Sequence, residues 1–361
     1  MKKVVIFCPY PKYEAPSQRF RFEQYISTLE EHGFKVTYLS FFNQSAWNTL
    51  KRKAGKFRTL GVMIKALLFR GLHIMQAMPA DYVFIHRETL PMGPPILEWA
   101  ISKLFLKKII YDFDDAIWIT DKVRESKFER MIRHRSKVAA ICRWSYKISV
   151  GNAYLAGYAR EFNPNVQINP TTIDTKALHN RGRFDTPHLP DSQRLVIGWT
   201  GSYTTLKYLL QAESILQEIE TNHPHVYFLV IADEEPKLQV KNFYFKKWKK
   251  ETEIEDLLLM DIGIMPLPDD AWTQGKCGFK ALQYMALEIP PVVSPVGVNT
   301  SIINHGVNGY LCKTPKEWIN TLEQLIQDAD VRKRVGAKAR ETIVTNYSVA
   351  SNSSNFLSLF D

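Results

Sequence analysis

Short apolar runs alternate with segments of helical periodicity along the whole chain. Such a run, bounded by turn residues, is typical of a strand that is buried on both faces. The alternation with helices predicts βαβ units and parallel sheets, and therefore an α/β fold. The predicted strands are Val4–Cys8, Val36–Leu39, Asp81–Ile85, Lys108–Tyr111 and Ile148–Val150, then the start of Leu195–Ser202, Val226–Ala232, Asp261–Met265 and Val292–Val293.

The predicted helices lie between these strands. One runs from Arg19 to a terminating Gly33, and others cover Leu206–Ile219, Glu251–Leu259 and parts of Trp318–Tyr347. With 361 residues the chain is too long for one ordinary core, so we expect two domains. A proline-containing, loop-like stretch at residues 176–192 is the predicted linker between residues 1–175 and residues 193–345.

The stretch Gly275–Asn299 combines a glycine-containing loop, a short amphipathic helix and a buried strand. Gly275 and Gly278 allow the backbone to approach a ligand closely. A helix that begins near Cys277–Phe279 would direct free N–H groups toward this loop, and Lys276 and Lys280 would add two positive charges. The stretch therefore predicts an anion site, with a plain βαβ connection as the alternative.

The same stretch resembles the donor-binding segment of retaining glycosyltransferases with the GT-B fold (glycosyltransferase family 4). Gln283-Tyr-Met-Ala286 and Pro291-Val-Val293 match that pattern in register. Gln283 stands where the family has its second motif glutamate, and Gly275 stands where it has the first. A bacterial subgroup has a similar Gly-Lys, Lys and Gln-Tyr-Met-Ala version. Gly151–Leu155, Asn169–Asp174 and Gly198–Ser202 also resemble segments of this family.

The resemblance implies two Rossmann-like lobes with a cleft between them. Residues 1–175 would form the acceptor lobe, residues 193–345 the donor lobe, and residues 346–361 a tail that crosses back to the first lobe. The donor-binding residues are then expected to be Gly201, Ser202, Lys276, Gly278, Lys280 and Gln283. Lys280 is the catalytic candidate, because it can stabilise charge that grows on a departing diphosphate. Retention of configuration and transfer without a metal or other cofactor are implied by the resemblance alone.

Polar residues also gather where the first-lobe strands end. His86 and Arg87 follow one strand, Asp115 follows the next, and Arg19 and Arg21 follow the first. The family has acceptor- and sugar-orienting residues at this edge, usually including a histidine. His86 and Asp115 are therefore the catalytic candidates here, and Arg19, Arg21 and Arg87 are the acceptor-binding candidates. Helix capping by Asp115 and surface salt bridges of Arg19 and Arg21 remain alternatives.

Positive charge is concentrated in the first half of the chain. Residues 1–175 hold 27 Lys and Arg against 15 Asp and Glu, whereas the remainder holds 20 against 22. Lys51–Met78 interleaves cations with large apolar residues, a pattern typical of helices that lie on anionic membranes. Packing of the apolar face against the sheet is the alternative.

Other global features indicate the compartment. No apolar run reaches the roughly 18 residues of a membrane span. The four cysteines show no metal or disulfide spacing. We expect a cytoplasmic protein, with peripheral association at the inner face of the membrane left open.

The sequence thus predicts a hexosyltransferase that uses a nucleoside diphosphate sugar and a glycan or lipid-linked acceptor, in surface polysaccharide or glycolipid assembly. A nucleotide-sugar epimerase on the same scaffold remains an alternative. A non-catalytic nucleotide-sugar-binding protein is another, because both motif glutamates are replaced. Nucleic-acid binding is disfavoured, since the basic stretches lack a stacking or groove-reading module.

Overall fold

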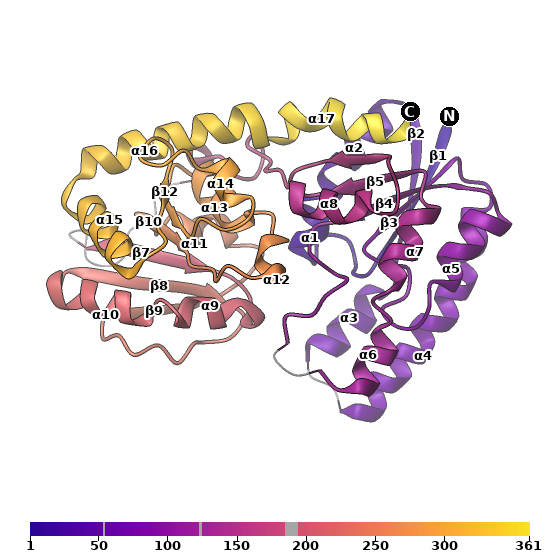
Figure 1. Ribbon diagram of the computed structural model, residues 1–361, viewed down its shortest axis with the longest axis horizontal. Helices are drawn as coiled ribbons and strands as arrows, with labels where there is room; N and C mark the ends of the chain where they lie inside the picture. The colour runs from indigo at the N-terminus through magenta and orange to yellow at the C-terminus, as the bar shows by residue number, and fades with distance from the viewer. Residues whose placement is uncertain (53–54, 123–124, 185–193) are drawn as a thin grey trace. The chain divides into compact units, whose positions relative to one another are not determined.

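The computed structural model describes residues 1–52, 55–122, 125–184 and 194–361. Its contacts divide the chain into two units. Unit 1 comprises Met1–Thr171 and Asn352–Asp361, and unit 2 comprises Thr172–Ser351 (Figure 1). Residues 185–193 lie outside the described residues. They include residues 185–192 of the predicted linker and residue 193, where the donor lobe is predicted to begin.

Unit 1 is built on a parallel sheet of six strands in the order β2-β1-β3-β4-β5-β6. The order reverses between β1 and β3, so the loops that follow these two strands diverge at a topological switch point. In such sheets ligands bind beyond the carboxyl ends of the strands at this point. The strands are β1 Lys2–Cys8, β2 Phe34–Ser40, β3 Tyr82–His86, β4 Lys108–Phe113, β5 Lys147–Val150 and β6 Val166–Ile168.

Helices flank this sheet, and α3, α6 and part of α4 extend beyond it (Figure 1). The helices of unit 1 are α1 Pro16–Arg19, η1 Glu23–Tyr25, α2 Ile26–Glu31, α3 Gln44–Lys51, α4 Lys56–His73, η2 Ile74–Ala77, α5 Ile96–Trp99, η3 Ala100–Leu104, α6 Lys127–Arg133, α7 Lys137–Trp144 and α8 Ala153–Arg160, together with the end of α17 Val349–Leu357 and η7 Ser358–Phe360.

The last residues of the chain pack within unit 1. The ring of Phe356 stacks on Tyr25 at 4.4 Å between centroids, and Phe360 contacts Tyr82 at 5.6 Å. The amide of Asn355 donates to the Ile168 carbonyl at the edge strand β6. Because these aromatic residues are buried, the chain terminus is part of the hydrophobic core of unit 1.

Unit 2 contains a second parallel sheet of six strands, in the order β12-β11-β10-β7-β8-β9. Here the order reverses between β7 and β10. The strands are β7 Leu195–Thr200, β8 Val226–Ala232, β9 Phe243–Lys247, β10 Ile262–Met265, β11 Pro291–Val293 and β12 Tyr310–Leu311. The helices are η4 Arg181–Arg183, η5 Tyr203–Thr205, α9 Leu206–Leu210, α10 Glu213–Asn222, α11 Glu253–Leu257, α12 Ala271–Gln274, α13 Phe279–Ala286, α14 Asn299–Ile302, α15 Pro315–Gln327, α16 Ala329–Thr342 and η6 Ile343–Tyr347.

The prediction of one helix from Arg19 to Gly33 is wrong. The chain forms α1, η1 and α2 instead, because all six residues from Gln18 to Glu23 are buried. A surface helix can bury only one stripe of its circumference, so six consecutive buried residues require the helix to break. The single helix predicted over Leu206–Ile219 is likewise divided into α9 and α10.

Candidate functional site

The helix α13 packs on β7 and β10, the two strands at the switch point of unit 2. Tyr284 of α13 contacts both strands. Its hydroxyl accepts a hydrogen bond from the Thr200 N–H at 3.0 Å, at the end of β7, and donates to the Ile264 carbonyl of β10 at 3.3 Å. Its ring lies on Gly263, where an added Cβ would be 2.4 Å from the ring. The position of α13 is therefore fixed against both strands.

The helix α13 begins immediately after Gly278, which has a left-handed backbone with φ 67°. Glycine suits this position for two reasons: the positive φ, and a Cβ position only 2.6 Å from Ile302 Cδ1. The predicted helix start near Cys277–Phe279 is confirmed. The N–H groups of the first turn of an α-helix have no partner inside the helix, and this end carries a partial positive charge.

Both predicted lysines lie on this part of unit 2, surrounded by aromatic rings. Lys280 Nζ lies 5.1 Å from the centroid of the Trp199 ring. Lys276 Nζ lies 5.9 Å from the Tyr208 ring and 5.5 Å from the Trp272 ring. The π faces of the rings favour the charged lysines. Two cations and a helix N-terminus together make a site suited to a diphosphate.

The glycine turn after β7 contributes Gly201 and Ser202. A Cβ on Gly201 would be 2.3 Å from the Trp199 ring, so only glycine fits between this ring and Thr205. The Ser202 N–H donates to Thr205 Oγ1 at 3.1 Å, and its hydroxyl lies 2.9 Å from Thr204 Oγ1. Ser202 is exposed on this turn, where its hydroxyl is accessible to a ligand.

Gln283 lies deeper than the two lysines. Its side chain is buried, and Nε2 lies 3.3 Å from Glu253 Oε1 and 3.3 Å from His179 Nε2. The structure thus gives this amide partners within unit 2. The sequence did not point to Glu253 or His179, because their distance in sequence from Gln283 gives no local pattern.

The polar residues of unit 1 form a buried network around Asp112 at the end of β4. Arg21 forms an ion pair with the Asp112 carboxylate and donates to Ser149 Oγ at 3.2 Å. His86 Nδ1 lies 2.8 Å from Asp112 Oδ2. Burial would raise the pKa of Asp112, but Arg21 and His86 outweigh it and hold that pKa well below the usual range. Asp112 is therefore the anionic centre of this network.

His86 and Arg21 are both buried in this network. His86 has no exposed surface and lies 5.3 Å from the Phe22 ring, and Arg21 is also buried. In this structure both can affect a ligand only through neighbouring groups. Arg19 is buried as well, with its guanidinium 4.9 Å from the Phe20 ring.

Arg87 and Asp115 are nearer the surface. Arg87 Nη2 lies 2.6 Å from Asp115 Oδ2 and 2.7 Å from Asp114 Oδ1. Burial would lower the pKa of the guanidinium, but these two carboxylates raise it. Arg87 has a φ of 61°, a conformation that is costly for a side-chain-bearing residue. Such backbone strain often occurs at functional sites. The backbone N–H of Arg87 donates to the Asp112 carbonyl at 2.7 Å.

The helix α4 presents a separate surface of unit 1. One face is anchored by Arg70, which is buried and donates to the carbonyls of Leu39 at 2.9 Å and Cys8 at 3.0 Å. The opposite face exposes large apolar side chains at helical spacing. They are Phe57 (92% exposed), Leu60, Ile64, Leu68 (69%), Leu72 (66%) and, from η2, Met75.

This segment is also the one candidate for a membrane span among the described residues. Lys56–Ala77 has a mean hydropathy of 1.3 over its most apolar window, of which 17% is buried. Length and composition alone are weak evidence for a span, because the core helix of a soluble protein can be equally long and apolar. The anchoring by Arg70 shows instead that one face of α4 packs on unit 1.

Comparison with known proteins shows which sequences and structures the chain resembles. Residues 194–328 match the family model of glycosyl transferases group 1, which covers most of unit 2. No curated protein sequence matches the chain. A glycosyltransferase from Rickettsia africae has a similar structure, with a TM-score of 0.67, 14% identity, and 99% of this chain and 98% of that chain covered.

Two further solved structures are similar to this chain over nearly its whole length. Sucrose-phosphate synthase from Thermosynechococcus elongatus has a TM-score of 0.68 at 12% identity, covering 100% of this chain and 98% of that chain. HepE from Anabaena, in complex with UDP and glucose, has a TM-score of 0.62 at 12% identity, covering 99% of both chains. The chain therefore has the GT-B fold of two Rossmann-like domains, as the sequence predicted, and its residues 194–328 match the model of group 1 glycosyl transferases.

Proposed function

We propose that this protein is a glycosyltransferase that moves a hexose from a nucleoside diphosphate sugar to an acceptor hydroxyl, with retention of configuration, in surface polysaccharide or glycolipid assembly. The observation that carries the proposal is the cationic site at the start of α13, where Lys276 and Lys280 accompany the helix N-terminus. A nucleotide-sugar donor is supported by HepE, a structural relative solved with UDP and glucose.

In the proposed reaction the bond between the sugar and the diphosphate breaks, and negative charge grows on the diphosphate. Lys280, Lys276 and the N–H groups of the first turn of α13 stabilise that charge. Ser202 and the Gly201 turn hold the phosphates. Gln283 contacts the nucleotide ribose, for which its amide must exchange its contacts with Glu253 and His179. Because these groups supply the positive charge, we propose transfer without a metal ion.

The acceptor residues are proposed to lie in unit 1. Asp115 and Arg87 are the groups that contact the acceptor, since both side chains are partly exposed, at 23% and 24%. Arg21 and His86 act through Asp112 by fixing the ends of β3 and β4. Arg19 is proposed to support the loop that follows β1.

The proposed activity is tested by incubating the protein with UDP-, GDP- and ADP-sugars in the presence and absence of EDTA. We expect release of one nucleoside diphosphate, faster when glycan or lipid-linked acceptors are added, and unaffected by the chelator. Conversion of the donor to its epimer without an acceptor would indicate an epimerase instead. Absence of turnover with every donor would contradict the proposal.

We further propose that unit 1 docks on the inner face of an anionic membrane through α4. The exposed apolar stripe of Phe57, Leu60 and Leu68 would enter the interface, and the exposed Lys56, Arg58 and Lys65 on the same helix would contact lipid phosphates. Docking would place the acceptor unit near lipid-linked substrates. Of the cations in the predicted segment, Lys51 pairs with Glu14, and Lys53 lies outside the described residues.

Co-sedimentation with anionic vesicles tests this docking. The substitutions Lys56→Gln and Arg58→Gln together should weaken binding by about 2 kcal/mol, or roughly 30-fold, because each cation near an anionic surface contributes about 1 kcal/mol. Binding should also fall as salt rises, and Phe57→Ser with Leu68→Ser should weaken it at every salt concentration.

The matched control replaces Lys313 and Lys316, two exposed lysines of unit 2, with Gln. This control should bind vesicles as the wild type does. Equal loss in the control and in the α4 variants would assign the effect to total charge and would contradict docking through α4.

A further inference from the structure

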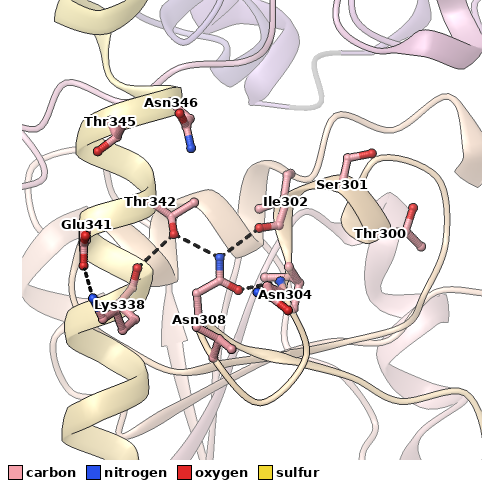
Figure 2. A pocket seen from close by; sticks show the side chains of 12 residues that line it. Thr300, Ser301, Ile302, Asn304, Asn308, Lys338, Glu341, Thr342, Thr345 and Asn346 are labelled. Carbon is pink, nitrogen blue, oxygen red and sulfur yellow. Dashed lines mark hydrogen bonds and ion pairs between the residues drawn. The ribbon is translucent and has the colours of Figure 1, made fainter.

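A polar hollow of about 580 Å³ opens on unit 2 beside α14 and the end of α16 (Figure 2). None of the proposed donor-binding residues lines it. Its walls come from α14, from the loop after α14, from the end of α16 and from the helical segment that continues α16. The residues that line it are Thr300, Ser301, Ile302, Ile303, Asn304, Val307, Asn308, Lys338, Glu341, Thr342, Thr345 and Asn346.

The base of the hollow is held rigidly by Asn308. Its side-chain amide donates to the Ile302 carbonyl at 3.1 Å and to Thr342 Oγ1 at 3.0 Å, and its Oδ1 accepts from the Asn304 N–H at 2.7 Å. Asn308 is itself buried. These bonds, drawn in Figure 2, tie the loop after α14 to α16. The hollow therefore has a preformed shape, which lowers the entropic cost of binding.

Other lining residues have polar side chains that are available to a ligand. The side chains of Ser301, Asn304 and Thr345 are exposed, and within the described part of the chain they make no hydrogen bond. They come from three different segments and supply two hydroxyls and one amide. Hydroxyls and amides donate and accept, so they match the paired donors and acceptors of a polyhydroxyl ligand.

The lining has no net charge. Its lysine and its glutamate form an ion pair, with Lys338 Nζ 2.7 Å from Glu341 Oε2. A phosphate or nucleotide would need an excess of cations, which this hollow lacks. Val307, which is 46% exposed, adds an apolar surface of the kind that the C–H groups of a sugar contact.

One wall has an unusual backbone. Ile343–Tyr347, which carries Thr345, is a π-helical turn that directly continues α16. Such wide turns are rare and occur often at functional sites. The turn supports the presence of a site. The class of ligand is inferred from the chemistry of the lining residues.

We propose that this hollow binds a neutral saccharide, separately from the donor. Its floor is connected to the proposed donor site, because the Ile302 side chain lies against Gly278 at the start of α13. A glycan held here would stay attached to unit 2 between transfers. The inference concerns a second site and does not depend on the identity of the donor.

Saturation-transfer NMR with maltotetraose, cellotetraose and chitotetraose tests the proposal on the full chain. At least one of these should bind with a Kd below about 10 mM. The double substitution Asn304→Ala and Thr345→Val should weaken that binding about 4- to 100-fold, since each lost hydrogen bond is worth roughly 2- to 10-fold. The control Gln327→Ala, an exposed amide on α15, should bind normally.

UDP binding measured on the same samples separates the two proposals. It should be equal in the wild type and in the double variant, because Asn304 and Thr345 are not donor-binding residues. Oligosaccharide binding that is absent, or that is the same in the double variant, overturns the saccharide site. If the wild type does not bind UDP, the proposed donor site is contradicted, but the proposed saccharide site is not.

Discussion

Asp112→Ala is expected to destabilise unit 1 by about 3–5 kcal/mol, the usual cost of breaking a buried ion pair. Asp112 is buried and is contacted by Arg21, His86 and Ser149. Its removal leaves the Arg21 guanidinium buried without its counterion, and an unpaired buried charge is far more costly than a missing pair. Asp112→Asn keeps the shape but loses the charge, so it should destabilise less.

Hydrogen exchange with mass spectrometry provides the measurement, because it reports on each unit separately. Peptides from β3, β4 and β5 should exchange faster in Asp112→Ala, whereas those from β7 and β10 should not change. Glu31→Ala, which removes an exposed carboxylate of α2, is the matched control. Unchanged protection of β4 in Asp112→Ala would show that the network does not stabilise the sheet.

Acid should reveal the same network. The pKa of Asp112 is lower in the folded than in the unfolded chain, so its contribution is complete above the unfolded value of about 4. That contribution is lost progressively as the pH falls below this value toward the folded pKa. Asp112→Asn should therefore lack this component of the acid sensitivity of unit 1.

The sheets could be predicted from the sequence because their strands are buried on both faces. Val226–Ala232 is a continuous apolar run with the same bounds as β8, and such a run has few other structures available to it. The edge strand β9 was not predicted. Its Lys246 and Lys247 are charged, and Lys246 pairs with Asp256 at 2.6 Å, a contact that depends on the tertiary fold.

The same distinction applies to the candidate site. The start of α13 is a local feature, since Gly278 and the apolar spacing that follows it lie in one short segment. The Asp112 network is not local: Arg21 and Asp112 are 91 residues apart. No periodicity indicates such a pair, and for this reason the sequence suggested arginines facing a ligand where the structure has Arg21 buried.

Other features of the site could be found only in the structure, for a different reason. The backbone strain at Arg87 has no sequence signal, because arginine rarely adopts a positive φ. The hydrogen bonds of Tyr284 were also missed. Only the structure shows that its hydroxyl bonds both β7 and β10, because these contacts depend on the tertiary fold.

Lys280→Ala is expected to lower the rate of sugar transfer by roughly 10- to 100-fold while the protein stays folded. One charge-assisted contact contributes about 1.5–3 kcal/mol, and in the proposed reaction this contact strengthens as charge develops on the diphosphate. Lys280 is only partly buried, and its ammonium lies over Trp199, so its loss leaves no large cavity. Replacement of both Lys276 and Lys280 with Ala should lower the rate further, although not additively.

Steady-state kinetics with limiting and saturating donor distinguish the possible roles of Lys280. A contact that strengthens only in the transition state lowers kcat and kcat/KM together, whereas one made equally in the bound donor raises KM alone. We expect the first pattern. Lys316→Ala removes an exposed lysine of α15 and should retain wild-type rates. Wild-type turnover by Lys280→Ala at both donor concentrations would remove this residue from the reaction, and the anion site at the start of α13 would then have a binding role only.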